Sequence, residues 1–379
     1  MISKIKLLYK RFYQKANYDV QKALLLNAKI LSNYNNQKQF VKSLDEVEFQ
    51  VFSQRGEDGI IQYIVNKIEI PNKTFVEFGV ETYTESNTRF LLFNNNWSGL
   101  VIDGCKKNIN FIKKDLIYWK YDLVAVNSFI TKENINTLIS DYTKNQDIGL
   151  LSLDIDGNDY WIWDSINCIN PRIVVCEYNS AFGSSRKVSV PYKSDFVRSK
   201  EHYSDLYFGA SLGAFCDLAE KKGYDFIGTS SAGVNAYFVR KDLSGPFIKY
   251  NSENGFNESA NRDSRNEKGE LLFLRHHERL NLIKELRNNK FTIFTISFPS
   301  NILELKKNFL PLSGISMSKT IHCNENGYYS IYQSDRYGFN NPDLIKKKWL
   351  TKCKNKYCQS DVQSLIKIKV NFHFQFHLQ

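Results

Sequence analysis

Acidic side chains gather where buried apolar runs end, and they are the residues of this chain best suited to chemistry. Asp154, Asp156 and Asp159 lie within six residues at the end of the run GLLSLDID and just beyond it. On a continuous strand, Asp154 and Asp156 would point to the same side, about 6.6 Å apart. A polar segment, residues 177–179, ends the next apolar run. If the two runs are neighbouring strands, these groups converge at one edge of a sheet.

Two kinds of chemistry fit this set of oxygens. One is a Mg²⁺ site, because carboxylate and amide oxygens suit a hard cation. The other is metal-free, with Asp156 taking a proton directly from the substrate. We favour the metal-free arrangement, because an Asp-Gly-Asn turn has an ordinary structural explanation. The predicted catalytic residues are Asp156, Asp159, Glu177 and Tyr178, and the alternative metal ligands are Asp154, Asp156, Glu177 and Asn179.

Two further acidic residues follow earlier apolar runs. Glu77 stands two positions before Gly79 at the end of TFVEFGV, and Asp103 ends GLVIDG. They are about 25 residues apart, close to the spacing of a βαβ unit that binds a nucleoside cofactor. The glycine lets the backbone approach the cofactor, and Asp103 is placed to accept hydrogen bonds from ribose. The turn lacks the other glycines of a dinucleotide fingerprint, so we do not expect NAD.

The apolar runs that carry these residues predict the fold. Near-continuous apolar strands separated by helix-length segments indicate a parallel sheet with helices on both faces. The last two runs are joined by a short turn and must pair antiparallel. We therefore predict an α/β fold with a doubly wound, mostly parallel sheet and a C-terminal antiparallel strand pair. The predicted strands are 74–80, 99–104, 149–156, 172–179, 224–230 and 235–240.

The chain divides into three predicted parts. Residues 1–45 form a helical segment, residues 46–290 form the α/β domain, and residues 291–379 form a small β-rich appendage. A polar loop is expected at 251–270, with a helix after it to about residue 286, and strict alternation predicts a long strand over 366–378. A zinc site would have nonstandard spacing, so ordinary cysteines are favoured over it. Its candidate ligands are His322, Cys323, Cys353 and Cys358.

Composition excludes several classes of protein. Apolar residues make up 42% of the 379, enough for a sizeable core, which argues against a disordered protein. The net charge is +11, yet no basic stripe with interleaved aromatics supports nucleic-acid binding. No apolar run approaches the ~20 residues that span a bilayer, and no export signal is apparent, so we expect a cytoplasmic protein. The basic N-terminal helix is predicted to be a capping helix, with weak membrane-surface contact as the lesser alternative.

Several segments carry a resemblance to a known family. They are similar to the FkbM-like branch of class I S-adenosylmethionine-dependent methyltransferases, and in particular to members associated with bacterial surface-polysaccharide clusters. The resemblance covers roughly residues 45–290, with the blocks in the expected order. The segments are SQRGEDGIIQYI (53–64), FVEFGVETYTESNTRFLL (75–92), WSGLVIDG (97–104), LLSLDIDGNDYWIW (150–163), PRIVVCEYN (171–179), YFGASLGAF (207–215) and GVNAYFVRKDL (233–243).

The resemblance implies a Rossmann-like methyltransferase fold and S-adenosylmethionine as cofactor. It places Asp103 on the cofactor ribose and Asp154 under the methionine end. The implied cofactor-binding residues are Gln54, Glu57, Asp58, Glu77, Gly79, Asn87, Asp103 and Asp154. The chain departs from the family pattern at Tyr83 and Ser86, where glycine and cysteine are expected, and at Gly149, where aspartate is usual.

The expected activity is methylation of a hydroxyl on a sugar nucleotide or glycan in surface-polysaccharide biosynthesis. Methyl transfer is an in-line displacement that needs positioning and a base, so no covalent nucleophile is required. One alternative is an inactive scaffold of the same fold, which the change at Tyr83 would permit. Another is an acyl-ester hydrolase acting through the tail. Residues 324–343 are similar to a segment that precedes the nucleophile of SGNH-type hydrolases, but no Gly-Asp-Ser follows.

Overall fold

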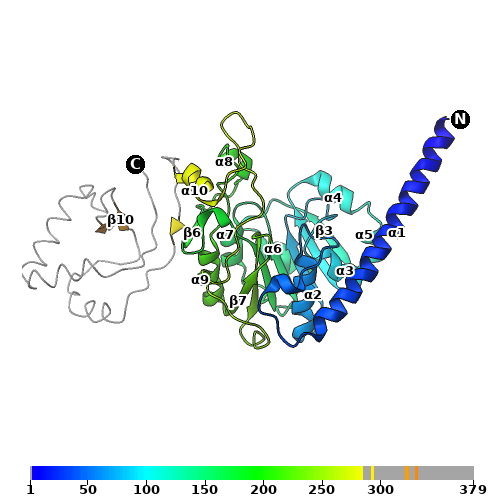
Figure 1. Cartoon of the computed structure of the whole chain (residues 1–379), viewed down its shortest axis with the longest axis horizontal. Coiled ribbons are helices and arrows are strands. Elements are labelled where there is room, and N and C mark those ends of the chain that lie inside the picture. The colour runs from blue at the N-terminus through cyan, green and yellow to red at the C-terminus, as the bar shows by residue number, and fades with distance from the viewer. Residues whose placement is uncertain (1, 285–291, 294–320, 324–328, 332–379) are drawn as a thin grey trace, which may run out of the picture.

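A seven-stranded sheet organises the chain (Figure 1). The computed structural model describes residues 2–284, 292–293, 321–323 and 329–331. The sheet has the strand order β3-β2-β1-β4-β5-β8-β7. Its strands are β1 (Thr74–Phe78), β2 (Ser98–Asp103), β3 (Leu123–Asn127), β4 (Leu150–Leu153), β5 (Ile173–Glu177), β7 (Tyr224–Thr229) and β8 (Asn235–Arg240).

The direction of the strands confirms the predicted fold class. The strands β3, β2, β1, β4 and β5 pair in parallel, and β8 is antiparallel to both β5 and β7. The predicted hairpin is therefore present, but its second strand lies inside the sheet and its first strand is at the edge. Because the chain winds outward in both directions from β1 and β4, the loops after these two strands diverge and leave room for a ligand.

The sheet differs from the prediction in two details. Strand β4 ends at Leu153, so Asp154 and Asp156 lie in the loop after it rather than on a strand. Strand β3 was not predicted, because it is an edge strand with a short, partly exposed apolar run. An edge strand needs only one buried face, so it lacks the continuous apolar signal of the central strands.

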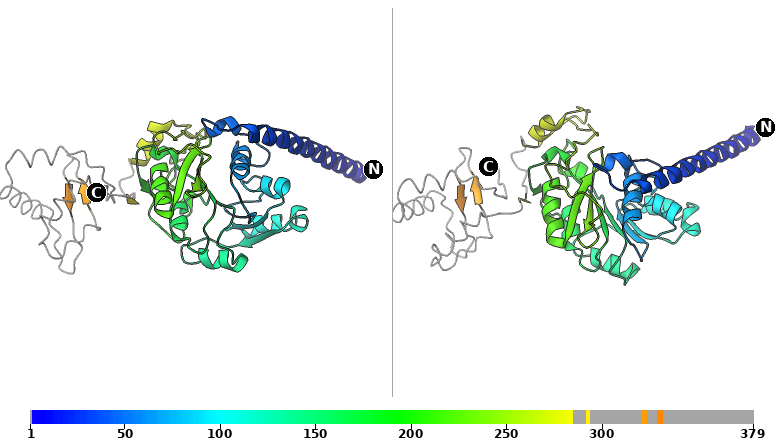
Figure 2. Two further views of the ribbon diagram at one scale, coloured as in Figure 1. Left: turned by 90° about the horizontal axis from the view of Figure 1, so that it is seen from below. Right: turned by 60° about the horizontal axis from the view of Figure 1, so that its bottom comes forward.

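Helices cover both faces of the sheet (Figure 2). One core cluster joins one face of the sheet to α6 (Ile135–Tyr142), α7 (Asp159–Ser165) and α9 (Leu212–Lys222). A second cluster joins the other face to α2 (Glu57–Lys67), α3 (Arg89–Asn95), α4 (Lys106–Ile112) and α5 (Ile117–Lys120). This three-layer packing holds the strand ends, and the loops that follow them, in fixed positions.

The N-terminal helix α1 (Ile2–Gln37) projects from this body, as both views in Figure 2 show. Its C-terminal half packs against the body near α2, where Ala28, Ser32 and Asn35 are buried. Within the described chain, no helix is long and apolar enough to cross a membrane.

Short elements complete the described structure. Helix α10 (His276–Lys284) begins later than the helix predicted after the polar loop 251–270. Residues 270–275, before α10, are extended or irregular. The predicted strand over 366–378 lies outside the described residues, as do Cys353 and Cys358. The remaining elements are η1 (Leu44–Val47), η2 (Ser180–Phe182), α8 (Arg198–Glu201), β6 (Val188–Ser189), β9 (Thr292–Ile293), β10 (Ile321–Cys323) and β11 (Tyr329–Ile331).

Candidate functional site

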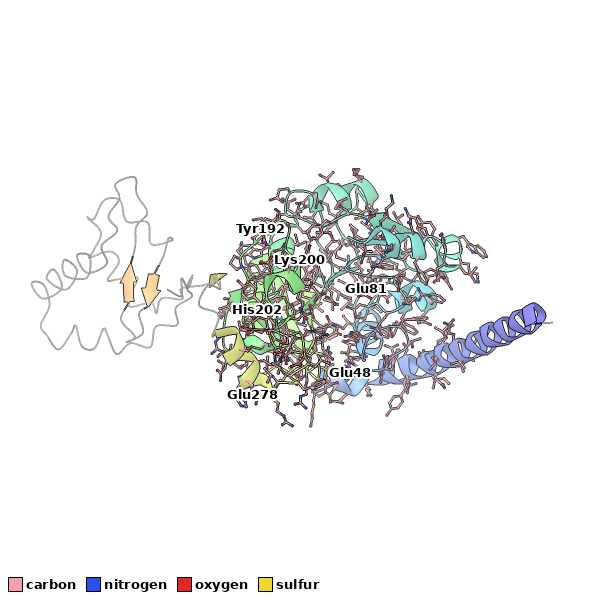
Figure 3. The ribbon with its side chains drawn as sticks, turned by 90° about the horizontal axis from the view of Figure 1, so that it is seen from above. Glu48, Glu81, Tyr192, Lys200, His202 and Glu278 are labelled. Carbon is pink, nitrogen blue, oxygen red and sulfur yellow. The ribbon has the colours of Figure 1, made fainter. Side chains whose placement is uncertain are left out.

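A cleft of about 590 Å³ lies at the carboxyl ends of β1, β2, β4 and β5. This is where doubly wound sheets bind their ligands. Most residues singled out from the sequence line it: Gln54, Glu77, Gly79, Asn87, Asp103, Asp154, Asp156, Glu177, Tyr178 and Asn179. Glu57, Asp58 and Asp159 were also singled out, and they are not among the lining residues. In Figure 3, Glu81 marks the loop after β1, and Lys200 and His202 mark the region of α8.

Glu77 orders the loop that follows β1. Its carboxylate accepts hydrogen bonds from the backbone N–H of Asn87 at 2.8 Å, from that of Thr88 at 3.2 Å, and from the Thr88 hydroxyl at 2.5 Å. Burial raises the pKa of Glu77 to about 7, against these hydrogen bonds, which favour the ionised form. The loop is therefore tied back to the strand that it leaves, and one side of the cleft is fixed.

Gly79 makes the closest backbone approach in the site. Its φ is +71°, a left-handed conformation, and a Cβ at this position would lie 1.6 Å from the carbonyl oxygen of Asp154. Only glycine fits where the loops after β1 and β4 cross so closely.

We expect Gly79→Ala to lower the free energy of unfolding by about 3 kcal/mol or more, because strain in φ adds to a backbone clash. Gly104→Ala is the matched control. Gly104 also lines the cleft, but its Cβ would meet nothing closer than the Phe129 ring at 3.5 Å, so we expect a change of about 0.5 kcal/mol. Urea unfolding of both variants measures the difference. Equal effects would contradict the assigned role of Gly79.

Asp103 joins the loops after β1 and β2. Its Oδ2 accepts the backbone N–H of Glu81 at 2.8 Å. Its Oδ1 accepts the N–H of Cys105 at 2.7 Å and the side-chain amide of Asn108 at 3.2 Å. Asp103 lines the cleft, and because a carboxylate oxygen can accept two hydrogen bonds, Oδ2 can accept one more.

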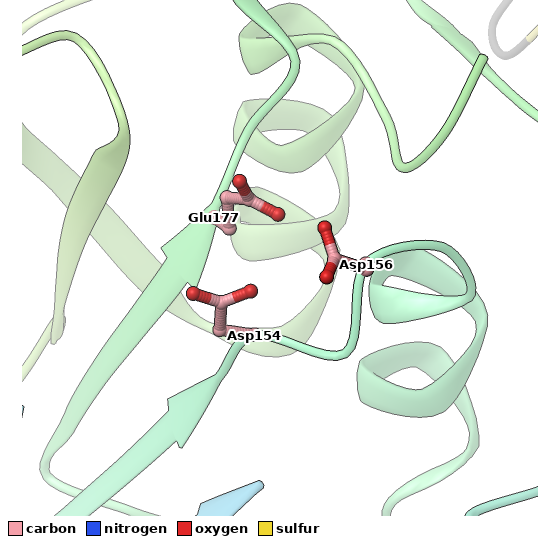
Figure 4. Close-up of side chains that lie close together, drawn as sticks. All are labelled: Asp154, Asp156 and Glu177. Atoms are coloured by element: carbon pink, nitrogen blue, oxygen red, sulfur yellow. The ribbon is translucent and has the colours of Figure 1, made fainter. Parts of the chain in front are cut away.

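Three carboxylates converge at the centre of the cleft (Figure 4). One oxygen from each of Asp154, Asp156 and Glu177 lies within 4.8 Å of the others. Burial raises the pKa values of Asp154 and Glu177 well above the usual range, and the negative charges of their neighbours raise them further. The Oε2 atom of Glu177 is buried and has no hydrogen-bond partner in the structure. The side chain of Glu177 is also hydrogen-bonded to that of Asp154, so Oε2 is the oxygen of Glu177 left to hold or accept a further proton.

A cation is already present beside these carboxylates. Nη1 of Arg198 lies 2.5 Å from Oδ1 of Asp156, and Nη2 lies 3.9 Å from Asp263. The guanidinium carbon lies 3.7 Å from the centroid of the Phe208 ring, a cation–π contact. Arg198 thus places a positive charge beside this cluster, whose three carboxylates are also close enough together to hold a metal ion. Arg198 was not selected from the sequence, since no motif surrounds it.

Tyr178 and Asn179 line the cleft, but their polar groups are engaged elsewhere. The Tyr178 hydroxyl donates to the carbonyl oxygen of Asn257 at 2.5 Å. The Asn179 amide donates to the carbonyl oxygens of Leu206 and Phe208, and its Oδ1 accepts the N–H of Ala181. Both side chains hold the segments that frame the cleft.

The three predicted residues outside the cleft hold turns. Oδ1 and Oδ2 of Asp159 accept the backbone N–H groups of Ile155 and Gly157, which shapes the loop that carries Asp156. Asp58 accepts the consecutive backbone N–H groups of residues 51–53. Glu57 accepts the N–H of Arg55 at 2.8 Å. Among the described contacts, these carboxylates therefore position loops around the cleft.

Tyr83, which departs from the pattern of the proteins that the sequence resembles, belongs to the loop beside the cleft, but its own side chain does not line the cleft. It is fully buried, with φ +59°, and its hydroxyl lies 2.9 Å from the Thr88 hydroxyl. Its carbonyl oxygen accepts Nη1 of Arg89 at 2.7 Å. The large side chain therefore packs beneath the loop after β1 and is not among the residues that line the cleft.

The polar segment that follows β8 forms the remaining wall. Ser259, Asn261 and Asp263 line the cleft, together with Arg279 from α10. Arg279 is only 4% exposed and donates to the carbonyl oxygen of Asn261 at 3.1 Å. The sequence predicted a loop here but no contribution to the site, because its polar composition resembles that of any solvated loop.

Comparisons with known proteins find distant structural similarities alone. No family profile matches the chain, and no curated protein matches its sequence. Among solved structures, the chain is similar to the N-terminal domain of EvdMO1 with SAH bound, at 9% identity and a TM-score of 0.34, covering 59% of this chain and 94% of that one. It is also similar to the plantazolicin methyltransferase BamL, at 13% identity and a TM-score of 0.32, covering 58% of this chain and 97% of that one. A third is an S-adenosylmethionine-dependent methyltransferase from Clostridium acetobutylicum, at 9% identity and a TM-score of 0.31, covering 48% of this chain and 90% of that one. Because these identities and TM-scores are low, the function must be argued from the residues of the cleft.

Proposed function

We propose that the chain is an S-adenosylmethionine-dependent methyltransferase that methylates a hydroxyl group of a sugar nucleotide or glycan in bacterial surface-polysaccharide biosynthesis. The observation that carries the proposal is the composition of the cleft. One end combines the tight turn at Gly79 with the carboxylate of Asp103, and the centre holds a carboxyl group with a free oxygen, Glu177. The sequence resemblance to the FkbM-like branch supports the same function.

The residues divide into a cofactor end and an acceptor end. At the cofactor end, Asp103 accepts a ribose hydroxyl, and the loop held by Glu77 encloses the nucleoside. The backbone of Asp154 crosses beside Gly79, and we assign this loop to the methionine end of the cofactor. At the acceptor end, Ser259, Asn261 and Arg279 offer the polar groups that a sugar requires. When bound, the cofactor supplies an electrophilic methyl group.

Glu177 is the base in this proposal. The acceptor hydroxyl gives its proton to Oε2 of Glu177 as its oxygen forms the bond to the methyl group, and the products are a methyl ether and S-adenosylhomocysteine. Asp156 was the sequence-based choice. In the structure Asp156 is 58% exposed and pairs with Arg198, whereas Oε2 of Glu177 is buried and has no hydrogen-bond partner. Asp156 instead orients Arg198 toward the cluster.

A Mg²⁺ held by Asp154, Asp156 and Glu177 is the alternative for the same chemistry, since it would lower the pKa of the acceptor hydroxyl. The ion pair between Arg198 and Asp156 favours the metal-free form, because the guanidinium already offsets the cluster's charge. Methyl transfer in EDTA separates the two: activity that persists excludes an essential exchangeable metal.

Calorimetric titration of the full chain tests the cofactor. We expect heat of binding with S-adenosylhomocysteine and none with NAD, because the turn at Gly79 has no pyrophosphate-binding glycines after it. Binding of NAD alone would overturn the proposal. Labelled S-adenosylmethionine with a panel of sugar nucleotides then tests the reaction. Cofactor binding without methyl transfer to any acceptor, including cell-surface glycans, would favour the inactive scaffold instead.

A further inference from the structure

The stretch from α4 to α5 exposes large apolar side chains. Trp119 is 71% exposed, Leu116 is 61% exposed and Phe111 is 49% exposed. The three lie within nine residues of sequence. Their neighbours Ile109, Ile112 and Ile117 are buried in the core, so one face of each helix is packed against the protein. Phe111, Leu116 and Trp119 do not belong to that buried set.

Lysines surround these apolar side chains. Lys106, Lys107, Lys113, Lys114 and Lys120 are all exposed. Nζ of Lys120 lies 5.4 Å from the centroid of the Trp119 ring.

The one side-chain carboxylate between Lys106 and Lys120 has partners within the protein. Asp115 accepts the backbone N–H of Ile117 at 3.1 Å and lies 3.5 Å from Nη2 of Arg89. The side chain of Asp115 is 22% exposed, whereas the five lysines are all exposed, so positive charge predominates on this stretch.

We propose that this α4–α5 surface, formed by residues 106–120, docks on an anionic lipid bilayer. Trp and Leu side chains enter the boundary between headgroups and acyl chains, and lysines keep their charge among the lipid phosphates. A cluster of lysines of this size is typical of segments that bind acidic lipids. Leu116 favours lipid over nucleic acid, because nucleic acids bind exposed apolar surface mainly by stacking bases on aromatic rings, and leucine has no ring.

The α4–α5 surface adjoins the cleft. Gly104 and Cys105 line the cleft, and α4 begins at the next residue. Phe129, which is 48% exposed, lines the cleft beside Gly104. Docking would therefore bring the cleft close to the headgroups, where a glycan carried on a lipid could enter. Entry of such a glycan rests on the proposed function, whereas docking itself does not.

Co-sedimentation of the full chain with vesicles tests the docking. We expect binding to phosphatidylcholine vesicles that contain phosphatidylglycerol, little binding to pure phosphatidylcholine, and weakening at high salt. The triple variant Lys113→Ala/Lys114→Ala/Lys120→Ala should bind about 100-fold more weakly, at roughly a tenfold loss per 1.4 kcal/mol and about 1 kcal/mol per lysine. The triple variant Phe111→Ala/Leu116→Ala/Trp119→Ala should bind vesicles about tenfold more weakly, or weaker still.

Matched controls come from other exposed side chains. Leu271→Ala/Phe273→Ala removes apolar side chains that are 45% and 54% exposed, and it should leave vesicle binding unchanged. Leu26→Ala/Ile30→Ala tests α1, where these residues are 63% and 66% exposed. A blue shift of tryptophan fluorescence on vesicle binding, lost in Trp119→Phe, would place Trp119 in the lipid.

Three results would overturn the docking proposal. They are no vesicle binding by the wild type, loss of binding in the α1 variant alone, and binding to heparin or RNA but not to vesicles. S-adenosylhomocysteine titration of the same preparations reports on the proposed function separately, because a protein that binds vesicles but no cofactor would retain the docking surface and lose only the methyltransferase assignment.

Discussion

Replacing Glu177 with glutamine is expected to lower the rate of methyl transfer by about 100- to 10,000-fold, the usual contribution of a positioned general base. The amide cannot accept the hydroxyl proton, but it keeps the shape of the side chain. Affinity for S-adenosylhomocysteine should stay within about twofold, because the cofactor end of the cleft is unchanged. Rates with labelled S-adenosylmethionine and titration of both proteins measure the two quantities.

The pH dependence provides an independent check on Glu177. A base must be deprotonated to act, so the wild-type rate should fall as the pH drops through the raised pKa of the Asp154 and Glu177 pair. Burial is the main cause of that raised pKa, so the fall should begin at higher pH than for an ordinary carboxylate. Glu177→Gln should lose this limb of the profile.

Asp263→Asn is the control for the Glu177 variant. It makes the same carboxylate-to-amide change in the same cleft, but at a side chain that is 57% exposed and lies 3.9 Å from Arg198. We expect its rate to stay within about fivefold of the wild type, since a rim charge contributes little. If Asp156→Asn lowers the rate more than Glu177→Gln does, the sequence-based choice of Asp156 as the base is the better one.

The second large effect is expected at Asp103. Asp103→Ala should weaken S-adenosylhomocysteine binding by about 10- to 150-fold, because a hydrogen bond to a charged group contributes about 1.5–3 kcal/mol. Asp103→Asn keeps an acceptor oxygen without the charge, so its affinity for S-adenosylhomocysteine should lie between that of the alanine variant and that of the wild type. Calorimetric titration of the three proteins gives the order.

Stability measurements must accompany the Asp103 variants, since Asp103 also accepts the backbone N–H groups of Glu81 and Cys105. Thermal unfolding detects any loosening of these loops. Asp122→Ala is the control, because Asp122 is an exposed carboxylate just before β3 that does not line the cleft. An Asp103→Ala protein with normal stability and normal cofactor affinity would show that ribose is bound elsewhere.

The sheet could be predicted from the sequence because its central strands are buried on both faces. Strands such as β1 and β5 must then be apolar almost throughout, and the polar residues at their ends stand out. That contrast alone identified Glu77, Asp103, Asp154 and Glu177, and all four line the cleft. The edge strand β3 was not predicted, because it is not buried on both faces and so lacks a continuous apolar run.

The details of the cleft depended on contacts between distant parts of the chain. Arg198 reaches Asp156 across 42 residues of sequence, and Arg55 donates to Asn261 across 206. A polar segment carries no local sign that it will close over a cleft, because its partners are chosen by packing and not by its own sequence.

The sequence alone thus determined the succession of strands and helices along the chain and the carboxylates at the strand ends, because burial restricts composition locally. Only the tertiary structure decided which carboxylates face the cleft. Asp58, Asp154 and Asp159 are chemically alike in the sequence, but hydrogen-bond geometry commits Asp58 and Asp159 to backbone N–H groups and leaves Asp154 in the site. A carboxylate's role depends on which donors surround it, and those donors are brought together only by folding.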